Sequence, residues 1–297
     1  MDWKPQVLAE GLEFPEGPVY MGGGVVVFTE ISGARLSRYA DGRVETIART
    51  GGGANGATLG PDAAFYVANN GGMNAGPEGV WLSEEAIPGR IQRVTADGQV
   101  SDVAVDLPGE PPHRPNDLCF GPDGLLYFTD PHNWEDLANL KPGRVNRTDL
   151  LGHAEQLAEV KRFPNGIGFG PDDRLFVAES LSQNVLVYDW RPDGLGAPAV
   201  FCVLPAGLPD GFCFSADGDL IICGSLGDAI LVYGSDGRLK DRFDTPQHSE
   251  PTNCCIGEGH LYVTYSGTGQ LVACPCGWEP LPLYPSRAEA AASRGTE

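Results

Sequence analysis

The sequence predicts an all-β fold, a six-bladed β-propeller with four-stranded antiparallel blades. Three observations predict it: a short motif that recurs six times, β-rich runs after each copy, and no helical periodicity between those runs. Each copy begins with a polar residue that carries a side-chain oxygen, and an apolar residue follows four places later. The six polar positions are Glu16, Asn55, Asn116, Asn165, Asp210 and, more weakly, Thr252.

Within each repeat the expected strands follow one order. The motif opens the first strand, which ends at a turn such as Gly121-Pro-Asp-Gly, and the run after that turn is rich in β-branched and aromatic residues. A third run leads to another turn, as at residues 35–42, and a short fourth strand follows. The copies lie about 40 to 60 residues apart, close to the length of a propeller blade. Each copy therefore predicts one blade.

A closed ring needs a segment that joins its last blade to its first. Residues 6–10 are expected to supply the outer strand of the last blade, whose other strands come from residues 252–273. The alternative, residues 281–284, is less favourable because proline cannot donate to a strand ladder. We therefore expect one domain over residues 1–285 and a flexible C-terminal tail over residues 286–297.

The bulk composition excludes some partners. A net charge of −20 argues against nucleic acid and anionic membrane, which need a basic patch. The N-terminus has no apolar core of signal-peptide length, so the expected location is the cytoplasm. The eight cysteines are expected to be reduced thiols, because Cys119, Cys213 and Cys255 occupy small-residue positions of the motif. Composition does not set the oligomeric state.

The motif positions predict a metal site. Equivalent positions in six blades surround one axis, and Glu16, Asn165 and Asp210 offer oxygen ligands there, with Asn116 as the candidate fourth ligand. Carboxylate and amide oxygens suit Ca²⁺, Mg²⁺ or Mn²⁺ and tolerate Zn²⁺. The alternative is that each residue caps a turn, since Asn-Gly and Asp-Gly are ordinary turn dipeptides. Five acid or amide residues at one position favour the metal.

A cation beside carboxylates suggests hydrolysis. A bound cation polarises an ester carbonyl and activates water, and a neighbouring carboxylate accepts the proton. Asp210 is the candidate base. Asp130, at the end of a second strand, is the next candidate, as a second base or as a group that orients a substrate hydroxyl; a turn cap is its alternative. The insertions at 69–90 and 131–144, with Trp81 and Trp134, are expected to overhang the ring as lids.

Other motifs carry less weight. The Gly51-x-Gly53-x-x-Gly56 sequence precedes a strand and lacks the helix that a dinucleotide site requires. The Cys254-Cys255 pair lacks the spacing of a structural zinc site. His113 and His132 are interpreted as surface or packing residues. Both add imidazole character near the expected mouth of the channel and so bear on substrate specificity.

Five motifs resemble the senescence marker protein/gluconolactonase family, which includes regucalcin-like and bacterial aldonolactonase proteins. They are Phe14-Pro-Glu16-Gly-Pro, Arg114-Pro-Asn116-Asp117, Tyr127-Phe-Thr-Asp130-Pro, Phe163-Pro-Asn165-Gly and Pro209-Asp210-Gly. The resemblance covers nearly the whole chain. It implies a six-bladed propeller that holds one divalent cation on Glu16, Asn165 and Asp210, with Ca²⁺ favoured.

The same resemblance implies a lactonase. The residues matching Arg114 and Asn116 contact the substrate in sugar-lactone members, and Asn116 also joins the metal shell. Diisopropyl fluorophosphatase, a more distant relative with a similar centre, keeps organophosphate hydrolysis open, and a non-catalytic calcium-binding propeller is the third interpretation. Arg114 beside the metal residues favours an enzyme acting on a small-molecule lactone.

Overall fold

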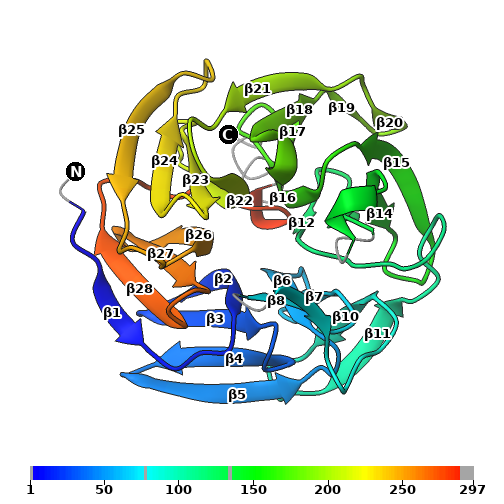
Figure 1. Ribbon diagram of the computed structural model, residues 1–297, viewed down its shortest axis with the longest axis horizontal. Coiled ribbons are helices and arrows are strands. Elements are labelled where there is room, and N and C mark those ends of the chain that lie inside the picture. The colour runs from blue at the N-terminus through cyan, green and yellow to red at the C-terminus, as the bar shows by residue number, and fades with distance from the viewer. Residues whose placement is uncertain (1–2, 77–78, 133–135, 288–297) are drawn as a thin grey trace, which may run out of the picture.

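The computed structural model describes residues 3–76, 79–132 and 136–287. Six four-stranded antiparallel sheets form a ring, as predicted, with β2, β6, β12, β16, β22 and β26 innermost (Figure 1). Blade 1 consists of β2 (Pro15–Gly22), β3 (Val25–Glu30), β4 (Arg35–Ala40) and β5 (Arg43–Arg49). Blade 2 consists of β6 (Ala54–Leu59), β7 (Phe65–Asn69), β10 (Arg90–Val94) and β11 (Val100–Ala104). Blade 3 consists of β12 (Leu118–Phe120), β13 (Leu126–Asp130), β14 (Gly143–Thr148) and β15 (Ala154–Val160).

The second half of the chain repeats this arrangement. Blade 4 consists of β16 (Pro164–Phe169), β17 (Leu175–Glu179), β18 (Asn184–Tyr188) and β21 (Ala199–Val203). Blade 5 consists of β22 (Leu208–Phe214), β23 (Leu220–Ser225), β24 (Ala229–Tyr233) and β25 (Leu239–Asp244). Blade 6 consists of β26 (Pro251–Gly257), β27 (His260–Tyr265), β28 (Gln270–Pro275) and β1 (Gln6–Ala9).

Short elements complete the fold. Two hairpins, β8 (Met73–Gly76) with β9 (Gly79–Leu82) and β19 (Trp190–Arg191) with β20 (Gly194–Leu195), lie outside the blades. The 3₁₀ turns are η1 (Leu137–Asn139) and η2 (Ser180–Ser182). No helix in the described ranges has the length and apolarity needed to cross a membrane.

The N-terminal strand closes the ring as predicted. Strand β1 pairs antiparallel with β28, Gln6 opposite Ala273 and Val7 opposite Val272 (Figure 1). Leu8 and Ala9 pack against the apolar cluster between blades 6 and 1. The alternative segment forms no blade strand: Pro280 bridges Ser215, and the chain continues toward the ring axis. Residues 288–297 of the expected tail lie outside the described residues.

Replacing Leu8 with serine is expected to lower the free energy of unfolding by about 1–3 kcal/mol, because the side chain leaves an apolar cluster at the closure. Val7→Ser is the matched control, since the Val7 side chain on the same strand is 43% exposed. Urea denaturation measures both. Equal losses from the two variants would contradict the inward orientation of Leu8.

The repeated Gly-Pro-Asp turns have a packing cause. An aromatic residue near the start of the second strand lies across the glycine: a Cβ on Gly60 would lie 2.2 Å from Cε2 of Tyr66, and one on Gly121 would lie 2.4 Å from Cε2 of Tyr127. Any larger residue would clash with a buried ring. The motif is therefore a packing unit as well as a turn.

Strand register places all the motif starts at one face of the ring. The first residues of each inner strand pair with the last residues of the second strand, as for Pro15 with Glu30 and Pro164 with Glu179. We call this the ring face. Hairpin β8–β9 rises from it, and the Ser32 hydroxyl donates to Asn74 Oδ1 at 2.7 Å, which anchors the hairpin on blade 1. The lid prediction stays a prediction, and Trp134 lies outside the described residues.

Candidate functional site

Three predicted ligands from three blades meet near the axis. Glu16 lies on β2, Asn165 on β16 and Asp210 on β22, and all three are buried. The Asn165 side chain hydrogen-bonds to the Asp210 carboxyl group, and the charge of Glu16 acts on Asp210. The fold thus brings together two carboxyl groups and one amide that are far apart in the sequence.

Two further residues of this cluster were missed from the sequence, Asp117 and Asn253. The Asn253 Nδ2 atom donates to Asp117 Oδ2 at 3.3 Å, and the Asn253 side chain also hydrogen-bonds to Glu16. Both residues stand one place after the motif's polar residue. In the other four blades this place is occupied by Gly17, Gly56, Gly166 and Gly211.

Two of these glycines, Gly56 and Gly211, make room for the two side chains. A Cβ on Gly56 would lie 2.3 Å from Asp117 Oδ1, and a Cβ on Gly211 would lie 2.0 Å from Cγ of Asn253. Glycine is therefore required next to each of them, since no neighbour can yield by that much. The signal in the sequence was this break in a glycine pattern.

The carboxyl groups of this cluster have raised pKa values. Burial, followed by the charge of Asp117, raises the pKa of Glu16 to about 8. Burial raises the pKa of Asp117 to about 7. Burial, then the charges of Glu16 and Asp117, raises the pKa of Asp210 well above its usual range. Such mutual repulsion between buried acids is the condition that a bound cation relieves.

The donor chemistry fits a hard divalent cation. Glu16 and Asp210 offer carboxylate oxygens and Asn165 offers an amide oxygen, the ligand types that Ca²⁺ prefers. Within residues 3–76, 79–132 and 136–287, no set of three or more His, Cys, Asp or Glu side chains is arranged to hold a metal. The candidate ligands Glu16, Asn165 and Asp210 are a mixed set instead, with two carboxyl groups and one amide.

Hydroxyl groups fix the inner strands of neighbouring blades relative to one another. Each donates to a backbone carbonyl at or next to a motif position in the next blade, so the motif backbone is held from the side. The pairs are Thr29 with Asn55, Thr129 with Asn165 at 2.7 Å, Ser180 with Pro209 at 2.7 Å and Thr252 with Pro15 at 2.9 Å. This belt holds the backbone that carries Glu16, Asn165 and Asp210.

Asn116 is buried beside Asp117. Its backbone N–H donates to the Thr129 carbonyl at 2.9 Å, and its own carbonyl accepts from the Gly56 N–H at 2.7 Å. Blades 2 and 3 are thereby joined at this residue. Its predicted roles as fourth ligand and substrate contact stay predictions.

Asp130 lies in a separate buried network on the ring face. Its Oδ1 accepts from the backbone N–H groups of Arg114 at 2.8 Å and His132 at 3.2 Å. Its Oδ2 lies 2.8 Å from His113 Nδ1 and accepts from Arg144 Nη1 at 3.0 Å. Burial would raise the pKa of Asp130, but the hydrogen bonds from His113 and Arg114 and the charge of Arg144 outweigh burial and hold it below its usual value. Protein donors thus occupy both carboxylate oxygens.

The same network places His113 and Arg114. The His113 side chain is only 12% exposed, so it is a bonded and largely buried residue. Arg114 Nη1 donates to the His113 carbonyl at 3.2 Å, and a Cβ on Gly71 would lie 3.3 Å from the same nitrogen. The Arg114 guanidinium therefore lies between blade 3 and the blade 2 insertion.

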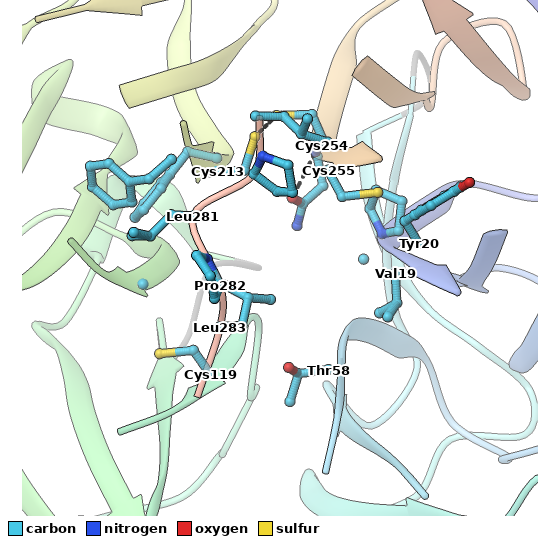
Figure 2. A pocket seen from close by; sticks show the side chains of 18 of the residues that line it. Val19, Tyr20, Thr58, Cys119, Cys213, Cys254, Cys255, Leu281, Pro282 and Leu283 are labelled. Carbon is cyan, nitrogen blue, oxygen red and sulfur yellow. Dashed lines mark hydrogen bonds between the residues drawn. The ribbon is translucent and has the colours of Figure 1, made fainter. Parts of the chain in front are cut away.

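A cavity of about 450 Å³ opens on the opposite side of the cluster from the ring face. Later residues of the inner strands line it, and residues 279–287 run along it (Figure 2). Asp117 and Asn253 belong both to its lining and to the buried cluster. A second hollow, of about 730 Å³, lies on the ring face between hairpin β8–β9 and the loops of blade 1.

A six-bladed propeller with acid and amide side chains gathered on its axis is the architecture expected from the resemblance to the senescence marker protein/gluconolactonase family. Residues 14–267 match the family described as SMP-30/Gluconolactonase/LRE-like region, and the chain belongs to this family. The resemblance seen in the motifs is thereby confirmed.

Particular relatives agree with this family. The chain is 26% identical over 274 residues to a gluconolactonase of Zymomonas mobilis, covering 85% of this chain and 76% of the relative. An L-arabinolactonase of Azospirillum brasilense is 36% identical over 109 residues, which are 35% of this chain and 36% of that protein. A solved structure of a gluconolactonase from Xanthomonas campestris superposes with a TM-score of 0.76 at 26% identity, covering 92% of this chain and 90% of that one.

Proposed function

We propose that the protein is a divalent-cation-dependent hydrolase that opens lactones. The lactonases among its relatives support a lactone-hydrolysing enzyme. The observation that carries the cation dependence is the buried cluster of Glu16, Asp117 and Asp210. Burial raises the pKa of all three carboxyl groups, and the charge of Asp117 raises the pKa of Glu16 and Asp210 further. Ca²⁺ is the favoured ion for this oxygen set, with Mg²⁺, Mn²⁺ and Zn²⁺ as alternatives.

Each residue of the cluster has a proposed role. Glu16, Asn165 and Asp210 hold the cation, with Asn116 as a fourth ligand. A divalent cation in such a site supplies Lewis acidity toward an ester carbonyl and toward water. Asp210 is the proposed general base, which accepts a proton from the attacking water at its carboxylate.

Residues around the cluster orient the substrate. Arg114 and Asn116 contact the lactone, and Asp130 positions Arg114 through its backbone N–H. Asp130 already accepts four hydrogen bonds or ion-pair contacts from protein groups, and its pKa is lowered, so a positioning role suits it better than the base role expected from the sequence. Asp117 and Asn253 orient Glu16 from the side away from the ring face.

Removing the metal tests the proposal. The protein is stripped with a chelator, assayed against aldonolactones, aryl lactones and a phosphotriester, and reloaded separately with Ca²⁺, Mg²⁺, Mn²⁺ and Zn²⁺. Lactone opening should disappear on stripping and return with at least one cation, while calorimetry reports binding independently of turnover. Full activity in a metal-free sample would overturn the proposal.

The same panel separates the alternatives. Turnover of the phosphotriester alone would indicate organophosphate hydrolysis, and tight Ca²⁺ binding without any turnover would indicate a non-catalytic propeller. Glu16→Gln tests the ligand assignment, because it keeps the size of the side chain and removes one of the two carboxylates. It should weaken cation binding in calorimetry.

A further inference from the structure

Sulfur atoms gather where blades 5 and 6 meet at the axis. Cys213 on β22 and Cys254 on β26 have Sγ atoms 3.6 Å apart, and Cys223 and Cys255 lie next to them. No disulfide joins the eight cysteines, all of which lie in the described ranges. Figure 2 shows Cys213 and Cys254 with their sulfurs turned toward each other at the edge of the 450 Å³ cavity.

We propose that Cys213 and Cys254 are a redox-modification site, which forms a reversible disulfide when the protein meets hydrogen peroxide or another small peroxide. The geometry favours this pair. A disulfide bond is about 2.05 Å long, so the two sulfurs must approach by about 1.5 Å. Strands β22 and β26 already touch just before the two cysteines, where Gly211 faces Asn253.

Cys254 is buried, and the cavity is the route by which a small peroxide reaches it. Cys213 is half-buried and both cysteines line the cavity, which is large enough to admit a peroxide. Hydrogen bonds from the Cys213 and Cys223 thiols lower the pKa of Cys254 from its ordinary value. The thiolate is the nucleophilic form of cysteine. Cys254 is therefore expected to react first.

The reaction balances in two steps. The Cys254 sulfur attacks a peroxide oxygen, the O–O bond breaks, and one water leaves while Cys254 becomes a sulfenic acid. The Cys213 sulfur then attacks the Cys254 sulfur, the S–O bond breaks, and a second water leaves. The two thiols lose two hydrogens in total and peroxide is reduced. A dithiol such as dithiothreitol returns the hydrogens and reopens the bond.

The bond should act on the cation site, and this part rests on the proposed function. Asn253 directly precedes Cys254 and hydrogen-bonds to Asp117 and Glu16, while Asp210 stands three residues before Cys213. Drawing β26 toward β22 displaces these contacts. In other proteins, losing the hydrogen bonds that orient metal-binding side chains weakens metal binding by about 10- to 100-fold. The disulfide form should therefore bind the cation more weakly.

Peptide mapping tests the bond itself. The reduced full-length chain is treated with equimolar hydrogen peroxide, alkylated under denaturing conditions, digested and sequenced by fragment ions. Two of eight thiols should be lost, leaving six (8 − 2), with Cys213 linked to Cys254, and dithiothreitol should restore all eight. Cys213→Ser should abolish the link. Cys202→Ser, a buried cysteine in another cluster, should leave it intact.

Three results would overturn the site: eight alkylatable thiols after peroxide, a link between other cysteines, or oxidation of Cys254 that stops at a sulfinic acid. Calorimetry with Ca²⁺ then compares the reduced and disulfide forms. Equal Ca²⁺ affinities of the two forms would overturn the expected effect of the disulfide on the cation site, but not the disulfide itself. If neither form binds any of the four cations, the proposed function fails and the mapping result is unaffected.

Discussion

Replacing Asp210 with asparagine is expected to remove most lactone turnover while leaving the cation bound. Asparagine keeps an oxygen ligand but cannot accept a proton at neutral pH, and Asp210 is the candidate base in the buried cluster. Loss of a general base costs about 10²- to 10⁴-fold in rate, so kcat should fall by that factor. Elemental analysis at a saturating cation concentration should show the metal content of the unchanged protein, although the variant, like Glu16→Gln, binds the cation less tightly.

Arg114→Ala is the matched comparison for this experiment. Its guanidinium lies outside the cluster, so metal content should again be unchanged, but the main effect should fall on KM. The two variants should therefore fail in different ways. An Asp210→Asn protein with full metal and near-normal kcat would remove Asp210 from the base role and leave its ligand role standing.

Replacing Asp130 with alanine is expected to destabilise the fold by about 3–5 kcal/mol, the cost of stranding a buried charge. Its carboxylate is fully buried and paired with Arg144, which is itself buried. Asp149→Ala is the matched control: Asp149 pairs with His153 at a similar 2.9 Å, but near the surface. Its carboxylate also accepts from the Leu151 and His153 backbone N–H groups, so its loss should destabilise the fold slightly, well below the loss at Asp130. Chemical denaturation of both variants measures the difference.

The sign of the pH dependence provides a second measurement at Asp130. The pKa of Asp130 is lowered in the folded state. Its contribution to the free energy of unfolding is therefore fully present above the pKa that Asp130 has in the unfolded chain, and it is lost as pH falls through the lower pKa of the folded state. The stability advantage of the unchanged protein over Asp130→Asn should therefore shrink below about pH 4. An advantage that grows with acidification would contradict the assigned network.

Local signals allowed most of the fold to be predicted from the sequence. The turns, strand runs and motif spacing are properties of short segments, and one repeat constrains the next. Even the closure by residues 6–10 could be inferred, because the last repeat lacked an outer strand. Glu16, Asn165 and Asp210 could be placed together for the same reason, since equal positions in a ring face one axis.

The remaining features depend on contacts without a local pattern. Asp130 and Arg144 face each other on the paired strands β13 and β14, and His113 reaches both from the segment before β12. No local pattern in the sequence predicts this third partner. The cavity opposite the ring face depends on residues 279–287 folding back along the axis, which a non-repeating segment does not reveal. Asp117 and Asn253 could have been found, but only by asking which side chains fill the space that Gly56 and Gly211 leave empty.

The closure of the ring also constrains how the chain can be made. Ala9 pairs with Leu271, so the first strand synthesised has its partner only when nearly the whole chain has left the ribosome. At about 5–20 residues per second, the 262 residues from position 10 to position 271 take about 13–50 seconds to translate. During that interval the last blade does not exist, and strand β1 has an unpaired edge and an uncovered apolar side. A circular permutant that begins at β2 and carries residues 1–14 after residue 297 would place β1 only about 30 residues after β28, so the last blade would be completed soon after β28 is made, and the chain should aggregate less during synthesis.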